Sequence, residues 1–314
     1  MYDVIITGAG PAGLAAGMYA ARSRMKTLIL TESAPGGRMT QTWEVENYPA
    51  LERMSGYDLA EKMLRQAKDF GAELMTRRVT ELDLRGSVKR AICENDTFEA
   101  RCMIIASGER ARKAGFIGED EFLGRGVSTC AACDGFFSRG REALVVGGGN
   151  SAAEEALFLT RFAEKVALLV RGDRLGCSED AALRLAENSK IILRFNTRLL
   201  RVGGSGKIEY AELACGRSEN TQIYRAANGE ALSVFVFVGH EPRTELLRGK
   251  LALDENGYVI AGEDTSTGEA GVFAAGDVRT KPFRQIVTAA ADGAAAAMSA
   301  EKYIAAEKNK FGQK

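Results

Sequence analysis

The amino-acid sequence predicts an α/β protein in which one nucleotide-binding unit is inserted into another. Two glycine-rich segments support this prediction, Gly8–Gly13 near the beginning of the chain and Gly147–Ala152 in its middle. Each follows a short apolar run and precedes small residues with helical spacing, the order in which a Rossmann-like unit binds a dinucleotide. A third glycine segment, Gly271–Asp277, continues the first unit near the end of the chain. We therefore expect two Rossmann-like, three-layer dinucleotide-binding domains, the second inserted into the first.

Size and composition exclude several other classes of protein. The 314 residues are 46% hydrophobic and 27% charged, which is ordinary for a globular protein of about two domains. Lys plus Arg equals Asp plus Glu at 42 each, so no net charge attracts the chain to nucleic acid or to a membrane. Apolar runs such as Ala231–Val238 are too short to span a bilayer, and the strand-like start at Tyr2 leaves no room for a signal peptide. We expect a cytoplasmic protein.

The first unit begins with a strand, a glycine turn, a helix and a second strand. Val4–Thr7 predicts a buried strand, Pro11–Ser23 a helix, and Lys26–Thr31 the next strand, which ends at Glu32. The three glycines of the turn permit a tight bend, close approach of a pyrophosphate, and close packing of helix on strand. The free N–H groups of the helix attract phosphate, and Glu32 is placed to accept hydrogen bonds from a ribose diol.

The segments that follow continue this unit. Helical apolar spacing predicts a helix over Ser55–Phe70. Alternating apolar residues predict strands of a small sheet at Glu73–Thr80, Lys89–Cys93 and Phe98–Ile105.

The second unit repeats the pattern of the first. Ala143–Val146 predicts a strand, Ser151–Leu159 a helix, Lys165–Val170 a strand, and Ser233–Val238 an apolar run that closes the region. Behind it, the Ala-rich stretch Val287–Ala300 predicts a closely packed helix. The domains are expected at residues 1–112 with 241–314, and at residues 113–240.

A cysteine pair lies just before the second glycine turn, in Cys130-Ala131-Ala132-Cys133-Asp134. Six cysteines are too sparse for a disulfide scaffold, and Cys130 and Cys133 alone have C-x-x-C spacing, so the other four are expected to be packed thiols. A zinc site would need further ligands, but the chain has no second C-x-x-C pair and a single histidine, His240. A vicinal pair between two dinucleotide sites therefore predicts a relay of electrons from one cofactor to a second and then to a disulfide.

These motifs resemble the low-molecular-weight thioredoxin reductase family, within the two-dinucleotide-domain flavoprotein disulfide reductases. The resemblance covers nearly the whole chain and rests on both glycine turns, Glu44–Pro49, Gly126–Phe137 and Gly271–Asp277. It implies a homodimer that passes two electrons from a donor, through FAD and the cysteine pair, to thioredoxin or a thioredoxin-like protein. It also implies that one domain rotates against the other about joints near Glu109–Gly118 and Gly239–Arg243.

The resemblance implies a role for particular residues of the first unit. The FAD ligands would be Gly8, Gly10, Gly13, Glu32, Gly37, Arg38, Asn47, Val79, Gly276, Asp277, Arg284, Gln285 and Ile286. Arg38 stands where the family usually has glutamine. Gly37 and Asn47 could instead be turn residues alone.

The resemblance also assigns the thiol chemistry. Cys133 would lie against the flavin, and Cys130 would exchange with the partner disulfide, which requires a thiolate of lowered pKa. Asp134 would be the general acid–base that protonates the leaving thiolate. The competing interpretation of Asp134 is a helix cap.

The second nucleotide site departs from the family pattern. Its ligands would be Gly147, Gly149, Asn150, Ser151, Glu154 and Arg171. NADPH-using relatives carry a His-Arg-Arg cluster after the next strand and a further arginine beyond it, which clamp the 2′-phosphate. Here Val170, Gly172 and Gly176 replace three of these four residues, Arg174 offers partial compensation, and no acidic residue of the kind NADH recognition uses ends the strand. The donor stays open between NADPH, NADH, ferredoxin and a second flavin nucleotide held in this site.

Two other functions compete with this interpretation of the sequence. A ferredoxin–NADP-type flavoprotein of the same fold would lack such a pair, so Cys130 and Cys133 argue against it. A flavoprotein that retains FAD as a redox sensor without turnover is compatible with the altered donor site.

Overall fold

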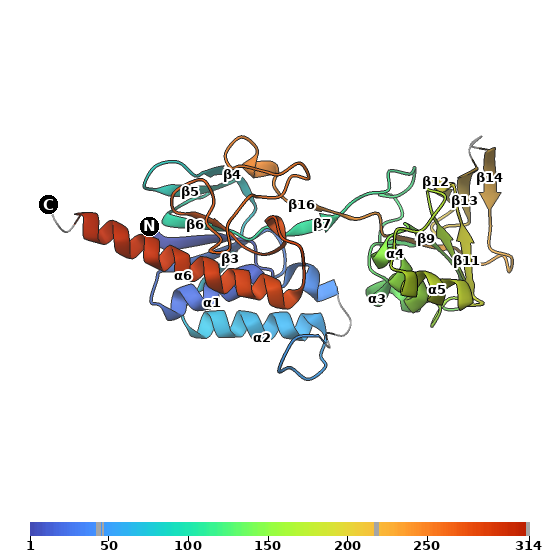
Figure 1. Ribbon diagram of the computed structural model, residues 1–314, viewed down its shortest axis with the longest axis horizontal. Helices are drawn as coiled ribbons and strands as arrows, with labels where there is room; N and C mark the ends of the chain where they lie inside the picture. Colours follow the sequence, from blue (N-terminus) through green and yellow to red (C-terminus); the bar gives the residue numbers. More distant parts are fainter. Residues whose placement is uncertain (42–44, 46, 217–219, 312–314) are drawn as a thin grey trace. The chain divides into compact units, whose positions relative to one another are not determined.

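The computed structural model describes residues 1–41, 45, 47–216 and 220–311, apart from the side chains at 41, 132, 133 and 308–311. The chain divides into two compact units, Met1–Arg110 with Glu241–Lys314, and Ala111–His240. Both are α/β and Rossmann-like, and the second is inserted into the first, as the sequence predicts (Figure 1).

The sheet of the first unit has the order β3-β2-β1-β6-β5-β4, with β17 also paired to β6. The long strand β6 belongs to two layers, because its first half pairs antiparallel with β5 and its second half pairs parallel with β1 and β17. The strands are β1 (Tyr2–Thr7), β2 (Thr27–Thr31), β3 (Glu73–Thr76), β4 (Val79–Asp83), β5 (Lys89–Cys93), β6 (Thr97–Ile105) and β17 (Val272–Ala274).

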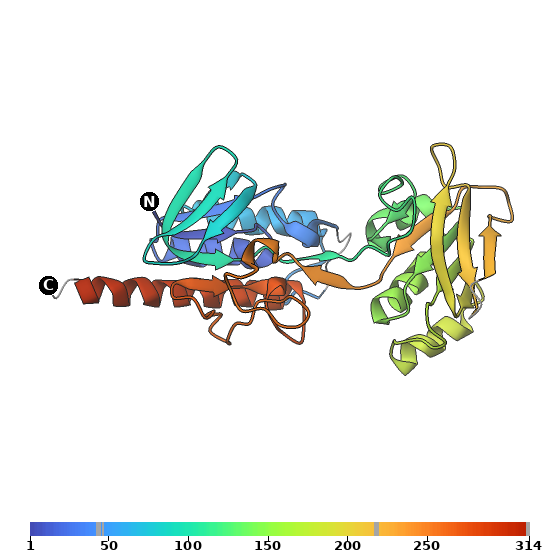
Figure 2. The same cartoon turned by 90° about the horizontal axis from the view of Figure 1, so that it is seen from above.

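Three layers follow from the two faces of this parallel sheet. Val4 and Ile6 of β1 lie in one buried cluster with the helices, whereas Ile5 lies in another with Leu82 and Ala91 of β4 and β5. Strands buried on both faces in this way are typical of parallel sheets. The antiparallel strands β4, β5 and β6 therefore form the third layer, opposite the helices (Figure 2).

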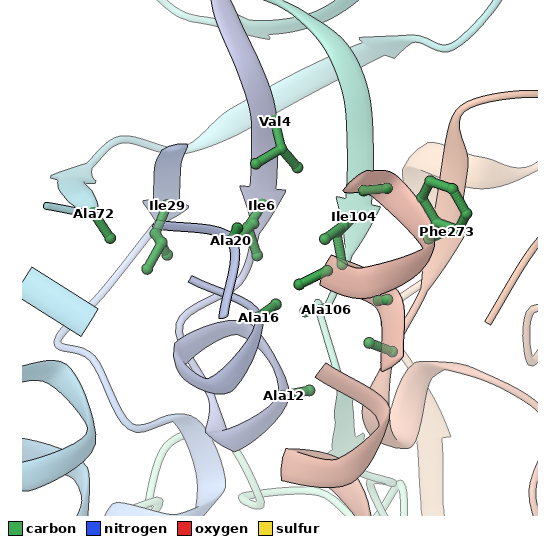
Figure 3. Close-up of a cluster of buried hydrophobic side chains, with 14 of the residues drawn as sticks. Val4, Ile6, Ala12, Ala16, Ala20, Ile29, Ala72, Ile104, Ala106 and Phe273 are labelled. Carbon is green, nitrogen blue, oxygen red and sulfur yellow. The ribbon is translucent and has the colours of Figure 1, made fainter. Parts of the chain in front are cut away.

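The helices of the first unit pack through small residues. Helix α1 contacts both α6 and α2, and Figure 3 shows Ala12, Ala16 and Ala20 of α1 within the cluster. A Cβ at Gly293 of α6 would lie 2.1 Å from the carbonyl oxygen of Ala12, so the two helices touch at backbone distance there. The helical elements are α1 (Pro11–Arg22), α2 (Gly56–Asp69), α6 (Ile286–Phe311), and the 3₁₀ turns η1 (Gly37–Gln41), η3 (Glu245–Leu247) and η4 (Gly276–Val278).

The second unit has the same three-layer plan. Its parallel sheet has the order β11-β10-β9-β15-β8, and a separate antiparallel sheet has the order β12-β13-β14 (Figure 2). The strands are β8 (Val127–Ser128), β9 (Glu142–Val146), β10 (Lys165–Leu169), β11 (Ile191–Arg194), β12 (Thr197–Gly203), β13 (Tyr210–Cys215), β14 (Asn220–Tyr224) and β15 (Ser233–Val236). The helical elements are α3 (Ala131–Asp134), η2 (Gly135–Ser138), α4 (Asn150–Leu159) and α5 (Glu179–Glu187).

The chain crosses between the units twice, and the two crossings pair with each other. They are β7 (Glu109–Ala111) and β16 (His240–Pro242), which form a two-stranded sheet. The backbone N–H of Arg112 also donates to the carbonyl oxygen of Gly239 at 2.9 Å.

One sequence-based expectation about the strands is wrong. The single strand expected over 73–80 is two strands, β3 and β4, separated at Arg77 and Arg78. Strand β3 pairs with β2 in the parallel sheet, whereas β4 pairs with β5 in the antiparallel layer. The break lets the chain leave one layer for the other.

Candidate functional site

The first glycine turn connects β1 to α1 and requires glycine at two of its three positions for steric reasons. Gly8 has φ +111°, and a Cβ there would lie 2.2 Å from the carbonyl oxygen of Ala106. A Cβ at Gly13 would lie 1.8 Å from the carbonyl oxygen of Gly8. A Cβ at Gly10 would instead meet no atom within 4 Å. The turn is therefore open in front of the N-terminus of α1, where an anionic group would meet free N–H groups.

The segment Gly36–Arg38 lies against this turn. The N–H of Gly36 donates to the carbonyl oxygen of Ala9 at 2.7 Å, and a Cβ at Gly37 would lie 3.2 Å from the Cα of Gly10. Gly37 has φ +58°, so the position also favours glycine for its backbone. The structure thus brings Gly37, predicted from sequence as a ligand, beside the turn, with Arg38 next to it.

The segment around η4 reaches the same turn from the end of the chain. A Cβ at Gly276 would lie 2.7 Å from the Cβ of Ala12, and the Gly276 N–H donates to Asp292 at 3.0 Å. The next residue, Asp277, has a buried Oδ1 atom with no hydrogen-bond partner within the described part of the chain. Burial raises the pKa of Asp277, and the negative charge of Glu109 raises it further. A buried acceptor of this kind fits a ligand that brings a hydroxyl donor, such as the polyol chain of FAD.

Glu109 is the functional candidate that sequence reasoning missed. Its side chain is 4% exposed and forms an ion pair with Arg38. Oε2 lies 3.5 Å from Nε of Arg284 and accepts a hydrogen bond from the Tyr258 hydroxyl at 3.2 Å. The Arg284 guanidinium lies 4.0 Å from the centroid of the Tyr258 ring. Two predicted ligands, Arg38 and Arg284, therefore share one buried carboxylate.

The other predicted ligands of the first unit are partly brought together. The Asn47 side-chain amide donates to the Gln285 side chain at 3.1 Å, and Ile286 packs against the cluster that contains Met39 and Val45. Residues 44 and 46 of the same motif lie outside the described residues. Val79 begins β4 and packs against the core on the antiparallel side of the sheet, so its side chain contributes to the core.

Glu32, expected to bind a ribose, already has a protein partner. Its carboxylate forms an ion pair with Arg243, and both side chains are about half exposed. The backbone of Arg243 is fixed by two further bonds, one from its N–H to the carbonyl oxygen of Gly108 and one from the Ser107 hydroxyl to its own carbonyl oxygen. Arg243 is a second residue at the site that sequence reasoning did not assign as a ligand.

Cys130 is disulfide-bonded, whereas Cys93, Cys102, Cys177 and Cys215 are free thiols, as expected. Cys133 lies in α3, and its side chain is outside the described part of the chain. The buried Ser128 hydroxyl accepts from the Cys130 N–H at 3.0 Å and can donate to its carbonyl oxygen at 3.1 Å, which holds the backbone at the start of the pair.

Asp134 follows the pair at the end of α3. Its N–H donates to the carbonyl oxygen of Cys130 at 3.2 Å, and its carboxylate makes no capping hydrogen bond to η2. The carboxylate is thus not used as a cap of that turn.

The second glycine turn connects β9 to α4 and resembles the first in its geometry. Gly147 has φ +153°, and a Cβ there would lie 2.4 Å from the carbonyl oxygen of Phe237. A Cβ at Gly149 would meet no atom within 4 Å, so this turn is also open at the start of its helix. Asn150 accepts the N–H of Ser178 at 2.8 Å, so its side-chain oxygen holds the start of α5. Ser151 lies exposed in the first turn of α4.

The loop after β10 is attached to this turn. The N–H of Gly176 donates to the carbonyl oxygen of Gly148 at 2.7 Å, while Arg171 and Arg174 are exposed. Glu154 is paired with Arg184 at 2.9 Å. The cations that this loop offers to a 2′-phosphate are therefore Arg171 and Arg174, and both side chains are exposed to solvent.

Among residues 1–41, 45, 47–216 and 220–311, no group of three His, Cys, Asp or Glu side chains is placed to hold a metal ion. None of the helices within the described ranges is long and apolar enough to cross a membrane.

Two Rossmann-like units, one inserted into the other and each with an open glycine turn, and a disulfide just before the second turn define a flavoprotein disulfide reductase. Comparison with known proteins agrees with this class. The sequence model of the pyridine nucleotide-disulphide oxidoreductase family matches residues 2–293. The chain belongs to this family.

Individual relatives place it more narrowly. A thioredoxin reductase from Peptoclostridium acidaminophilum is 41% identical over 98% of each chain, and one from Mycolicibacterium smegmatis is 43% identical over 97% of each. The crystal structure of Lactococcus lactis thioredoxin reductase covers 97% of this chain and 99% of its own, with 40% identity and a TM-score of 0.85. The resemblance to thioredoxin reductases seen in the sequence is confirmed, and with it an FAD-dependent, thioredoxin reductase-like activity.

Proposed function

We propose that the protein reduces thioredoxin or a thioredoxin-like protein through FAD in the first unit and the Cys130–Cys133 pair in the second. The observation that carries this proposal is the disulfide at Cys130, which stands in the sequence between two glycine turns that are both open at a helix N-terminus. The corresponding domains would be residues 1–112 with 241–314, and residues 113–240. The family resemblance supports a cytoplasmic homodimer.

Several groups of the first unit support the binding of FAD. The open turn at Gly10 and the free N–H groups of α1 would bind the pyrophosphate, Glu32 would bind the ribose, and Asp277 would accept a hydroxyl of the polyol chain. When bound there, FAD would supply the two-electron redox chemistry that links the donor to the disulfide.

The thiol steps follow from disulfide exchange. Two electrons and two protons convert the Cys130–Cys133 disulfide into two thiols. The Cys130 thiolate attacks one sulfur of the partner disulfide, which breaks the partner S–S bond and forms a mixed disulfide. Cys133 then attacks the sulfur of Cys130, which closes the original disulfide and releases the partner as a dithiol. Asp134 would supply the proton that each leaving thiolate needs.

The surface next to the pair supports a protein substrate. Phe136 and Phe137 directly follow it in η2 and are 60% and 67% exposed. Their rings are in edge contact, with centroids 6.2 Å apart. Exposed aromatic side chains beside a reactive group are typical anchors of protein–protein recognition.

The donor is proposed to be a nucleotide bound at the second turn with weakened recognition of a 2′-phosphate. Family membership implies a pyridine nucleotide, but only Arg171 remains of the four residues that would hold that phosphate, with Arg174 nearby as partial compensation. Each lost charge-assisted hydrogen bond removes roughly 1.5–3 kcal/mol of binding. NADH, ferredoxin, and a second flavin nucleotide held at the same turn are the alternative sources of electrons.

The thiol relay is tested by replacing Cys133 with serine. The Cys133→Ser variant should retain FAD but lose reduction of thioredoxin, because the mixed disulfide can no longer be resolved. The matched control is Cys177→Ser, which changes a free, partly buried thiol of the same unit and should leave turnover unchanged. Undiminished turnover in Cys133→Ser would refute the relay.

The donor is identified by anaerobic bleaching of the flavin absorbance near 450 nm (roughly the usual flavin maximum, a property of the cofactor). NADPH and NADH are added separately, and dithionite serves as the control that reduces any bound flavin. Bleaching by either nucleotide supports the pyridine nucleotide assignment and ranks the two. Bleaching by dithionite alone would refute it and direct the search to ferredoxin.

A further inference from the structure

Glu109 is a buried acid that the proposed mechanism does not use. It begins the crossing strand β7, where an acidic side chain would ordinarily face water, yet its side chain is 4% exposed. A buried carboxylate is costly unless it is paired and hydrogen-bonded. Here it is paired with Arg38 and Arg284 and bonded by the Tyr258 hydroxyl, so the surroundings compensate its charge.

These contacts fix the direction of the Arg284 side chain. The guanidinium lies over the Tyr258 ring at 4.0 Å, while Glu109 approaches Nε at 3.5 Å. Nε itself is buried and makes no hydrogen bond within the described residues. A ring on one side and a carboxylate at one edge leave the guanidinium few alternative orientations.

The same carboxylate orders Arg38, which belongs to a different segment. Arg38 follows Gly37, the residue in contact with the backbone of Gly10 in the open turn. Arg284 and Arg38 both act on Asp277, whose unsatisfied oxygen lies at the same site, and so does Glu109 with the opposite sign. Glu109 therefore connects the two segments that approach the turn from different parts of the chain.

The charged side chains around Asp277 form two separate sets of ion pairs. Arg279 and Lys281 are both paired with Asp292, at 3.2 Å and 2.9 Å. Arg38 and Arg284 share Glu109. Because Glu109 lies beside both guanidinium groups, its negative charge opposes part of their positive charge. Charges in such a little-hydrated place act strongly on one another.

We propose that Glu109 is a positioning residue of the FAD site, which holds Arg38 and Arg284 around one buried carboxylate and lowers the midpoint potential of the bound flavin. This inference rests on the proposed binding of FAD by the first unit. Two-electron reduction leaves negative charge on a flavin that takes up fewer than two protons, and nearby protein charge tunes that reduction. Arg38 and Arg284 favour the reduced state, and Glu109 opposes them.

The test compares the flavin midpoint potential of three variants with that of the unchanged protein. Glu109→Gln keeps the shape of the side chain but removes its charge, and should shift the reduction equilibrium at least tenfold toward reduced flavin, about 30 mV for a two-electron couple. Glu109→Asp keeps the charge and should stay close to the unchanged protein. The matched control Glu99→Gln removes a half-exposed, ion-paired acid on β6 of the same unit and should cause no shift.

Substitutions of Arg38, the ion-pair partner of Glu109, add a test that does not depend on the Glu109→Gln variant alone. Arg38→Gln should shift the equilibrium in the opposite direction, toward oxidised flavin, and Arg38→Gln combined with Glu109→Gln should return it toward the starting value. If Glu109→Gln does not fold or does not hold flavin, the comparison of Arg38→Gln with Arg38→Lys still measures the sign of the effect. FAD content and thermal unfolding are recorded for every variant.

Three results would overturn the inference: an unchanged potential in Glu109→Gln with flavin bound, a shift of the same size in Glu99→Gln, or a shift of Arg38→Gln toward reduced flavin. A purified, unchanged protein that binds no FAD would instead refute the proposed function. The two failures are therefore distinguishable.

Discussion

At the scale of single residues, the sequence identifies groups whose role depends on the local backbone and misses those whose role depends on distant neighbours. Gly8 and Gly13 are predictable, because a strand–turn–helix pattern requires glycine where the backbone comes close to itself. Glu109 and Arg243 look like ordinary surface charges in a connecting segment. Only the folded chain shows Glu109 between Arg38 and Arg284, and Arg243 against Glu32.

Two glycines of the first turn should respond to alanine in different ways. Gly10 has φ −76° and open space at its Cβ position, so Gly10→Ala should fold normally but hold FAD more weakly, since the methyl group occupies the place of the pyrophosphate. Gly13→Ala forces a Cβ to within 1.8 Å of the carbonyl oxygen of Gly8 and should destabilise the fold by about 1–3 kcal/mol or more.

Thermal unfolding without FAD and fluorescence titration with FAD separate these two effects. Equal melting temperatures with equal FAD affinity in Gly10→Ala would contradict the assignment of the open space to a phosphate.

At the scale of elements, the strands and helices that flank the two glycine turns follow their apolar patterns, whereas some outer elements do not. Strand β14 is predominantly exposed, so it has no buried alternation that a sequence pattern could show. Helix α5 buries only Ala181 and Leu185, although Ser178 at its N-cap, followed by two acids, was a usable signal. Both elements bury few apolar side chains, so their sequences carry a weak apolar pattern.

The contact between α1 and α6 gives a prediction at this scale. Gly293→Ala places a methyl group 2.1 Å from the carbonyl oxygen of Ala12, so the two helices must separate. We expect a loss of about 1–3 kcal/mol in the free energy of unfolding, despite the higher helix propensity of alanine. Met298→Ala on the exposed side of α6 is the control and should change stability by less than about 0.5 kcal/mol.

Urea unfolding of both variants measures the difference. A Gly293→Ala variant as stable as the Met298→Ala control would show that the helix pair tolerates separation.

At the scale of the whole molecule, the order of the two glycine turns and the cysteine pair is enough to predict the fold class and the reductase activity. Both depend on motifs that are local in the sequence. The donor is not predictable in the same way. Arg171 and Arg174 lie in an exposed loop, where they can bind the anionic groups of more than one kind of nucleotide. The choice of protein partner depends on the shape of the surface around Phe136 and Phe137. A sequence motif does not describe that shape.

Partner recognition can be separated from thiol chemistry by one substitution. Phe137→Ala removes an exposed ring beside the cysteine pair and should lower kcat/KM for thioredoxin by about 5- to 30-fold, the effect of losing roughly 1–2 kcal/mol of interface contact. Reduction of a small aromatic disulfide, which needs no docking surface, should be unaffected. Phe195→Ala, which removes a 38% exposed ring elsewhere in the same unit, is the control. An equal loss with both substrates would mean that Phe137 supports the thiols themselves.

The pairing of β17 with β6 has a consequence for biogenesis. Met103 and Val272 are neighbours in one sheet, so a nascent chain emerging from the ribosome cannot finish its first unit until nearly the whole polypeptide has been made. The inserted unit is continuous and can acquire its structure earlier. Because β7 and β16 pair, the two ends of the inserted unit then lie side by side. The two parts of the first unit are thus joined by a short effective loop, whose closure costs less entropy than that of a long one. Early folding of the inserted unit would thus act as an internal scaffold for its host.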